Sequence, residues 1–248
     1  MGLFGNLFTN SKTKEAADLS VLKTDIHSHL IPGIDDGAKS IEDSIAMITE
    51  FYNLGYRKLI TSPHVMSDYY RNSSETILSG LERVRGAIKD ANIDISIDAV
   101  AEYYLDADFE QKLENEKLLT FGDNYLLFEI SYMNPPDNLN AIVFKMQTMG
   151  YKPVLAHPER YNFWHKNYDK YLEFHDKGVL LQLNINSLTG YYSLPTKKIA
   201  EQMIDNGIIS LLGSDCHHQG HIKSLQNVVY EKSLHQLLIS GKLLNNTL

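Results

Sequence analysis

The stretch Asp25-Ile26-His27-Ser28-His29 follows a short apolar run near the start of the chain. Alternate side chains of a strand point the same way, so the two histidines would project together if the strand continues through them. Near the other end of the chain, Ser214-Asp215-Cys216-His217 follows a second apolar run with the same spacing between its aspartate and its histidine. Two pairs of metal-capable side chains therefore end two predicted strands that lie far apart in the sequence.

Short strands and amphipathic helices alternate along the chain between these two stretches. The strands, most of them rich in Val, Ile and Leu, are predicted at residues 21–27, 58–62, 95–100, 125–130, 152–156, 179–183 and 208–212. Helices are predicted to start near Ser40, Ser74, Asp137 and Thr196, and a terminal helix is predicted over residues 224–240. This alternation predicts an α/β fold of parallel strands.

The sheet could be an open doubly wound sheet or a closed barrel. No Gly-rich dinucleotide loop follows a predicted strand, which removes one support for the open form. In a barrel the C-terminal ends of all strands meet at one face, and polar residues stand at that end of most predicted strands. We therefore favour a barrel-like single domain over residues 21–248, preceded by a tail over residues 1–20.

The metal-capable residues at the predicted strand ends form one set of eight. They are His27, His29, His64, Glu102, Glu129, His157, Asp215 and His217. Imidazole and carboxylate together suit Zn, Mn or Fe. Eight ligands exceed the four of one tetrahedral ion, so two or three ions sharing carboxylates would use them all. Each motif alone has an ordinary interpretation, such as an ion pair for a glutamate, but their joint placement favours a polynuclear metal centre.

Composition excludes several other classes of function. The formal net charge is −8 and no block of Lys and Arg stands out, which argues against binding to nucleic acid. No apolar run approaches the ~20 residues of a membrane span. Cys216, the single cysteine, fits a reducing compartment such as the cytoplasm and lacks the arginine of a Cys-x5-Arg phosphate loop. The N-terminal residues could fray or form a weak interfacial anchor through Leu3, Phe4, Leu7 and Phe8.

The motifs resemble those of the PHP (polymerase and histidinol phosphatase) family. Within it they are similar to the bacterial protein-tyrosine phosphatases encoded with capsule and exopolysaccharide genes. The matching segments are residues 25–37 (DIHSHLIPGIDDG), 61–64 (TSPH), 156–161 (AHPERY) and 214–217 (SDCH), within a resemblance that covers about residues 22–240. The resemblance implies a distorted, TIM-like (β/α)7 barrel. It also implies up to three metal ions, held by the eight residues named above.

The resemblance also implies roles for residues outside the metal set. Asp36 matches an aspartate that touches the metal site or the activated water, and Arg160 matches an arginine that contacts the substrate phosphate. Relatives usually carry a further arginine shortly after the Asp-x-His motif, where this chain has Gln219, His221 and Lys223. Lys223 or His221 is the candidate to replace that arginine.

These expectations describe a metal-dependent phosphomonoester hydrolase. The leading hypothesis is a manganese-dependent phosphatase that acts on phosphotyrosine of a bacterial tyrosine kinase in capsule or exopolysaccharide synthesis. A metal-bound water, made hydroxide-like near neutral pH, would attack phosphorus. Loop tyrosines could stack on the substrate ring; they are Tyr69, Tyr70, Tyr103, Tyr104, Tyr132, Tyr161, Tyr191 and Tyr192. Two alternatives stay open: a small-molecule phosphatase for histidinol phosphate, and a non-catalytic module that binds a phosphorylated kinase tail.

Overall fold

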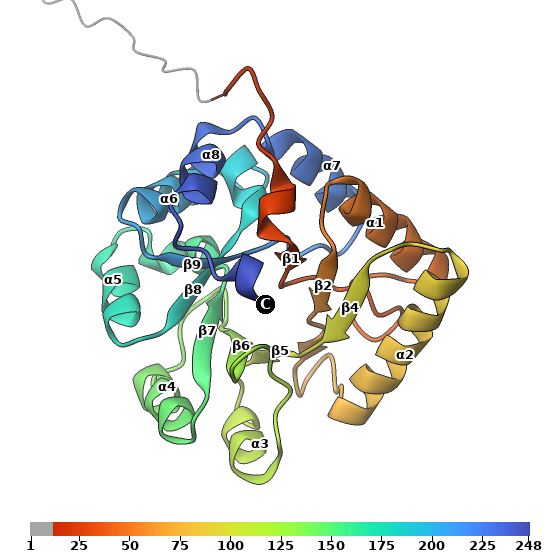
Figure 1. Ribbon diagram of the computed structural model, residues 1–248. Coiled ribbons are helices and arrows are strands. Elements are labelled where there is room, and N and C mark those ends of the chain that lie inside the picture. The colour runs from red at the N-terminus through yellow and green to blue at the C-terminus, as the bar shows by residue number, and fades with distance from the viewer. Residues whose placement is uncertain (1–11) are drawn as a thin grey trace, which may run out of the picture.

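Parallel strands form the centre of the molecule, and helices surround them (Figure 1). The structure is a computed structural model that describes residues 12–248. The strands are β1 Thr24–Asp25, β2 Lys58–Thr61, β3 His64–Val65, β4 Ser96–Ala99, β5 Glu102–Tyr104, β6 Tyr125–Glu129, β7 Lys152–Ala156, β8 Leu180–Asn184 and β9 Ile209–Gly213. They pair in the orders β1-β2-β4 and β3-β5-β6-β7-β8-β9, and every pair of neighbours is parallel.

Two strand units are interrupted in the middle. β2 is separated from β3 by Ser62 and Pro63, and β4 is separated from β5 by Val100 and Ala101. β2 pairs with β4 before these breaks, and β3 pairs with β5 after them. Proline has no N–H for the ladder, which helps to explain the break at Pro63. The strands of residues 12–248 therefore behave as seven units, which confirms the predicted distorted barrel of parallel strands.

The first and last strand units meet and close the ring. A parallel bridge pairs Ser28 with Cys216, and the backbone N–H of Asp215 donates to the carbonyl of His27 at 2.7 Å. The closure joins the two stretches with alternating metal-capable residues. The two stretches must meet in this way if all the predicted metal-capable residues are to form one site.

The Asn245 side chain adds to the closure at Thr24, where β1 starts, and at Leu212 in β9. Asn245 Nδ2 donates to the carbonyls of Thr24 and Leu212 at 3.0 and 2.7 Å. Its Oδ1 accepts from the Leu212 N–H at 2.9 Å. The Asn245 side chain is buried. Its hydrogen bonds pair backbone groups that a continuous ladder between β1 and β9 would otherwise pair.

Helices cover the outside of the barrel (Figure 1). They are α1 Ile41–Asn53, α2 Ser74–Asp90, α3 Phe109–Asn115, α4 Leu139–Thr148, α5 Asp169–Asp176, α6 Leu194–Asp205, α7 Gln219–Val228 and α8 Lys232–Ile239. Short 3-10 turns lie at η1 Leu19–Leu22, η2 Pro158–Arg160, η3 Asn162–Trp164, η4 Ile185–Thr189 and η5 Asn245–Thr247. Ser40 caps α1 as predicted, because its Oγ accepts from the Asp43 N–H at 3.2 Å.

Several predicted boundaries differ from the structure. The caps of α2 and α6 are Ser73 and Ser193, which lie one and three residues before the predicted Ser74 and Thr196. The run at residues 21–27 divides between η1 and β1. The single terminal helix over residues 224–240 is wrong, because α7 and α8 are separate and residues 229–231 lie between them.

The residues between α7 and α8 receive the N-terminal segment. The Thr13 and Ala17 N–H groups donate to the carbonyls of Tyr230 and Val229, both at 2.7 Å. Residues 13–17 therefore lie against the connection between α7 and α8. The interfacial anchor considered for Leu3, Phe4, Leu7 and Phe8 falls outside the described residues. None of the helices in residues 12–248 has the length and apolarity needed to span a bilayer.

Two apolar clusters separate the inside of the barrel from its outer layer. The interior cluster contains Ile26, Ile60, Val100, Phe121, Leu127, Val154, Ala156 and Leu211, with Leu244 and Leu248 packed against it. Along β6, Leu127 belongs to this interior cluster, whereas Leu126 and Phe128 belong to the outer one, as strand alternation requires. The apolar filling leaves the polar groups at the opposite, C-terminal ends of the strands.

We expect Asn245→Ala to lower the free energy of unfolding by about 3 kcal/mol, because it leaves buried backbone groups of Thr24 and Leu212 without partners. Urea denaturation measures this change. Asn246→Ala is the matched control, since Asn246 is exposed beside it and should change stability little. Equal stability of the two variants would contradict the bridging role of Asn245.

Candidate metal centre

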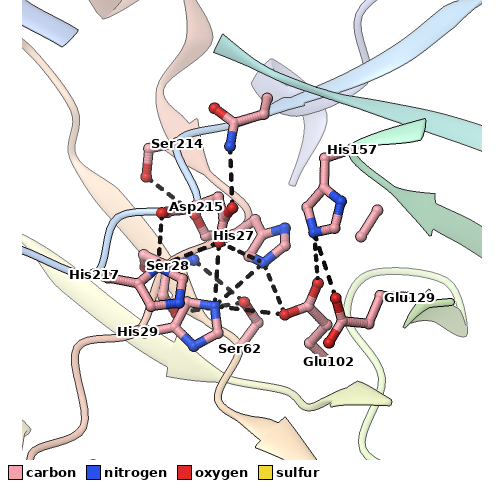
Figure 2. Close-up of polar contacts among 12 residues, drawn as sticks. His27, Ser28, His29, Ser62, Glu102, Glu129, His157, Ser214, Asp215 and His217 are labelled. Carbon is pink, nitrogen blue, oxygen red and sulfur yellow. Dashed lines mark hydrogen bonds and ion pairs between the residues drawn. The ribbon is translucent and has the colours of Figure 1, made fainter. Parts of the chain in front are cut away.

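All eight residues predicted from the strand ends come together at the C-terminal face of the barrel. Figure 2 shows His27, His29, Glu102, Glu129, His157, Asp215 and His217 directed toward a common region. His64 joins them, because its Nδ1 lies 3.0 Å from Glu102 Oε2 and 3.1 Å from Glu129 Oε1. The nitrogen and oxygen atoms form overlapping groups that could hold metal ions.

The first group joins the two ends of the barrel. The Nε2 atoms of His27 and His29 lie 3.4 Å apart, and Asp215 Oδ1 lies 3.4 Å from each of them. All three side chains are almost completely buried. Three electron-rich atoms thus converge where water cannot screen them, so a proton or a cation must compensate them.

Hydrogen bonds of the Nδ1 atoms of His27 and His29 determine which ring nitrogen faces the other metal-capable groups. His27 Nδ1 lies 2.9 Å from Gln182 Oε1, and His29 Nδ1 lies 2.8 Å from Asp35 Oδ2. Both partners are hydrogen-bond acceptors, so each Nδ1 carries the proton and each Nε2 can offer a lone pair inward. This tautomer is the one that a metal ligand needs.

Glu102 lies between the histidine groups. Its Oε2 lies 3.3, 3.5 and 3.0 Å from ring nitrogens of His27, His29 and His64, yet it accepts no hydrogen bond of adequate geometry. Its Oε1 lies 3.1 Å from His157 Nε2. A fully buried carboxylate oxygen in this position suits a carboxylate shared between ions, the kind of ligand that the sequence led us to expect.

Asp36 lies beside the metal-capable groups on the side that faces the pocket. Its Oδ1 lies 3.5 Å from His64 Nε2 and 3.4 Å from His217 Nε2. A hydrogen bond with His217 lowers the pKa of Asp36 to about 2. The Asp36 side chain is therefore ionised at neutral pH and can face a cation.

The electrostatic balance of the centre favours bound positive charge. Burial alone would lower the pKa of His27, but Glu102 and Asp215 outweigh it and raise that pKa to about 9. Burial opposes the charge of His64 as well, but Glu102 and Glu129 raise its pKa to about 12. The same carboxylates that attract protons would attract metal ions, and metal binding would release those protons.

A pocket of about 380 Å³ opens over the metal-capable groups. Its lining residues are Asp36, His64, Met66, Tyr70, Tyr104, Glu129, Tyr132, Met133, His157, Arg160, Asp215 and His217. Among the predicted loop tyrosines, Tyr70 stacks on His64 and Tyr132 stacks on His157, with ring centroids 5.4 and 5.8 Å apart. Tyr103 and Tyr161 are instead buried in the outer core. Aromatic rings thus line the pocket next to the charged, metal-capable side chains.

Arg160 enters this pocket, as expected for a phosphate contact. Its Nη1 donates to Asp215 Oδ2 at 2.6 Å. Burial opposes the charge of Arg160, but Tyr132 and Asp215 raise its pKa above the ordinary value. Arg160 therefore remains cationic beside the metal-capable groups.

The structure does not place Lys223 or His221 in the pocket. Lys223 lines a separate hollow with Lys12, Tyr191 and Glu231. His221 is buried behind His217, and its Nδ1 accepts from the His217 backbone N–H at 3.1 Å. The expectation that one of them replaces a second arginine is therefore not supported, because α7 directs both away from the pocket.

Sequence reasoning did not identify Asp35 and Gln182, which orient the histidines. Asp35 adjoins the predicted Asp36, but only the fold distinguishes the carboxylate that accepts from His29 Nδ1. Gln182 did carry a signal, since it is a polar residue among leucines in β8 and is completely buried. Cys216 is a buried, free cysteine.

We expect Gln182→Leu to weaken Mn²⁺ binding by roughly tenfold to a hundredfold, because His27 Nδ1 loses its acceptor. Calorimetric titration of Mn²⁺ into metal-stripped protein measures this effect. Gln147→Leu is the control, since Gln147 Nε2 donates to the Lys177 carbonyl away from the centre. Unchanged Mn²⁺ affinity in a folded Gln182→Leu protein would contradict the orienting role.

Comparison with known proteins gives evidence about the family of this chain that does not depend on the geometry of the site. The family model for capsular polysaccharide synthesis, CpsB/CapC, matches residues 23–233. The tyrosine-protein phosphatase CpsB of Streptococcus pneumoniae is 30% identical over 200 residues, covering 78% of this chain and 82% of the relative. The tyrosine-protein phosphatase YwqE of Bacillus subtilis is 28% identical over 195 residues, covering 78% and 77%.

Solved structures agree with the fold. Crystal structures described as those of YwqE from Bacillus subtilis and CpsB from Streptococcus pneumoniae, metal-dependent tyrosine phosphatases, include a chain that matches with a TM-score of 0.76. That match is 26% identical and covers 83% of this chain and 85% of the solved one. An amidohydrolase from Mycoplasma synoviae matches at 14% identity with a TM-score of 0.53, which supports the fold alone.

Proposed function

Because the chain belongs to the CpsB/CapC family of capsular polysaccharide synthesis, we propose that it is a metal-dependent protein-tyrosine phosphatase. Its relatives include tyrosine-protein phosphatases, and the similar solved structures are those of metal-dependent ones. The observation that carries the proposal is the convergence of eight imidazole and carboxylate side chains beneath a pocket that contains an arginine. This arrangement suits a phosphate whose charge metal ions would neutralise.

In this proposal the ligands are the eight residues at the strand ends. They are His27, His29, His64, Glu102, Glu129, His157, Asp215 and His217, with Asp36 facing the same ions. The overlapping groups suit two or three divalent ions. Donors of nitrogen and oxygen without thiolate fit Mn, Fe or Zn, and we propose manganese among them. When bound, the ions would supply a hydroxide-like water and would neutralise the phosphate.

The protein's own residues orient the substrate. Arg160 binds the phosphate from the side of the pocket, since its guanidinium keeps donors beyond the one that Asp215 occupies. Tyr70 and Tyr132 offer faces for an aryl ring. Asp36 does not fit the role of a proton donor to the leaving oxygen, because its lowered pKa keeps it ionised. A tyrosyl leaving group, with a pKa of about 10, depends less on such a donor than an alkyl ester does.

The proposed physiological substrate is a phosphotyrosine protein, most simply a bacterial tyrosine kinase of capsule or exopolysaccharide synthesis. The family description supports the capsule context, and the names of the relatives support phosphotyrosine. The two rival functions make different predictions. A histidinol phosphatase would turn over histidinol phosphate at least as well as a phosphotyrosyl peptide, and a binding module would hold the peptide without releasing phosphate.

Chelation should remove phosphotyrosyl-peptide turnover, and added Mn²⁺ should restore it, because the proposed metal ions would supply the hydroxide-like water and neutralise the phosphate charge. Elemental analysis before and after chelation gives the metal content. His157→Ala should reduce turnover by more than a hundredfold, whereas His175→Ala should not, since His175 is exposed on α5. Full activity in metal-free protein would overturn the proposal.

Arg160→Ala should raise KM for the peptide about tenfold to a hundredfold, because a charge-assisted contact with the phosphate is lost. The initial rate against peptide concentration measures it, with metal content checked because Arg160 also pairs with Asp215. Arg57→Ala is a matched control, since Arg57 packs over Tyr52 at 4.3 Å away from the site. An unchanged KM would exclude Arg160 from phosphate capture.

A further inference from the structure

Arg160 is the one lysine or arginine among the described residues that line the central pocket. A long, flexible cation loses rotamer freedom when it captures a phosphate, so an arginine that is already ordered binds better. We propose that Tyr192 is a positioning residue that holds the Arg160 guanidinium in place for phosphate capture. This inference rests on the proposed phosphatase function and adds a residue that determines how the phosphate is held.

The first support is the aromatic contact with the guanidinium. Arg160 Cζ lies 4.1 Å from the ring centroid of Tyr192 and 5.0 Å from that of Tyr132. Both distances are within the range of cation–π attraction. The Arg160 side chain is only 21% exposed, so solvent screens these contacts little. Together with the bond to Asp215, the two rings restrict the guanidinium on several sides.

The second support is that Tyr192 is itself anchored to the partner of Arg160. Asn184 Nδ2 donates to Tyr192 Oη at 2.8 Å and to Asp215 Oδ2 at 3.1 Å. Asn184 Oδ1 accepts from the Asn186 N–H at 2.9 Å, which fixes the orientation of the amide. One buried amide therefore sets the position of the tyrosine ring relative to the carboxylate that pairs with Arg160.

The third support is that the two segments that carry this arrangement are tied together. Glu159, beside Arg160 in η2, accepts through Oε1 from the Asn184 N–H at 3.1 Å and from Ser187 Oγ at 2.6 Å. Glu159 is completely buried. The backbone that bears the arginine is thus bound to the end of β8 and to η4, the segments that precede Tyr192.

Tyr192 gives a cleaner test than Tyr132. The Tyr132 ring stacks on His157, and its hydroxyl lies 3.4 Å from His157 Nδ1, so changing it would disturb a proposed ligand. Tyr192 has its hydrogen bond with Asn184 and its ring contact with Arg160. A change at Tyr192 therefore reaches the proposed ligands only through Asn184 and Arg160. A change at Tyr132 disturbs His157 directly.

The test compares Tyr192→Leu and Tyr192→Phe in the full, Mn²⁺-loaded protein. The dissociation constant of inorganic phosphate, measured by calorimetry, should rise about tenfold in Tyr192→Leu, because the aromatic face is lost. It should change less than about threefold in Tyr192→Phe, which keeps that face. KM for a phosphotyrosyl peptide should follow the phosphate affinity, with metal content unchanged. Calorimetry needs no turnover, so failure of the phosphatase proposal and failure of the positioning role are distinguishable.

Tyr168→Leu is the matched control. The Tyr168 hydroxyl also accepts from an asparagine, Asn206, at 2.8 Å, but Tyr168 lies outside the residues that line the pocket. Its removal should leave phosphate affinity unchanged. If Tyr192→Leu melts too early to study, Tyr192→Met fills more of the same volume without an aromatic face and carries the same expectation.

A double variant separates action through Arg160 from a general structural effect. In an Arg160→Ala background, Tyr192→Leu should cause no further loss of phosphate affinity, because the group that it positions is absent. A further loss in that background would overturn the proposal. A single Tyr192→Leu variant with wild-type phosphate affinity would overturn it as well, and so would a Tyr192→Phe variant as weak as Tyr192→Leu.

Discussion

The contact between the first and last strand units is the constraint on which the rest of the structure depends. The bridge of Ser28 with Cys216 and the bond from the Asp215 N–H to the His27 carbonyl bring the two alternating motifs into one place. Parallel strands in a ring have all their C-terminal ends on one face, so the remaining metal-capable side chains arrive there without further specification. Without this closure, Asp215 would not reach His27 and His29.

Closure of the barrel buries carboxylates and imidazoles whose charge needs compensation by bound protons or cations. Several imidazoles and carboxylates are buried within a few ångströms of one another, and Glu102 Oε2 has no hydrogen-bond donor. Burying such charges is costly unless cations or protons compensate them. Gln182 and Asp35 turn the imidazoles so that lone pairs face inward, which makes metal ions the better compensation. Similar solved structures are described as those of metal-dependent tyrosine phosphatases.

Beside the metal-capable groups, Arg160 is the one arginine among the described residues that line the pocket. Asp215 contributes to both regions, since Oδ1 faces the histidines and Oδ2 faces Arg160 and Asn184. The carboxylate therefore couples the position of the metal-capable histidines to the position of Arg160, the proposed phosphate-binding cation. Tyr192, packed on Arg160, would keep the guanidinium at a fixed position relative to the metal-capable groups while the substrate binds.

The sequence by itself determined the fold class and all eight metal-capable positions, because strand periodicity and strand-end placement are local patterns that a barrel converts into one site. It also indicated Arg160 and Asp36 through their motifs. Only the tertiary structure decided that Lys223 faces another hollow, that Asp35 and Gln182 orient the histidines, and that Tyr192 packs on Arg160. These facts depend on where a helix turns and on which distant side chains meet, and hydrogen bonds and ring contacts between residues remote in sequence leave no periodic trace in the chain.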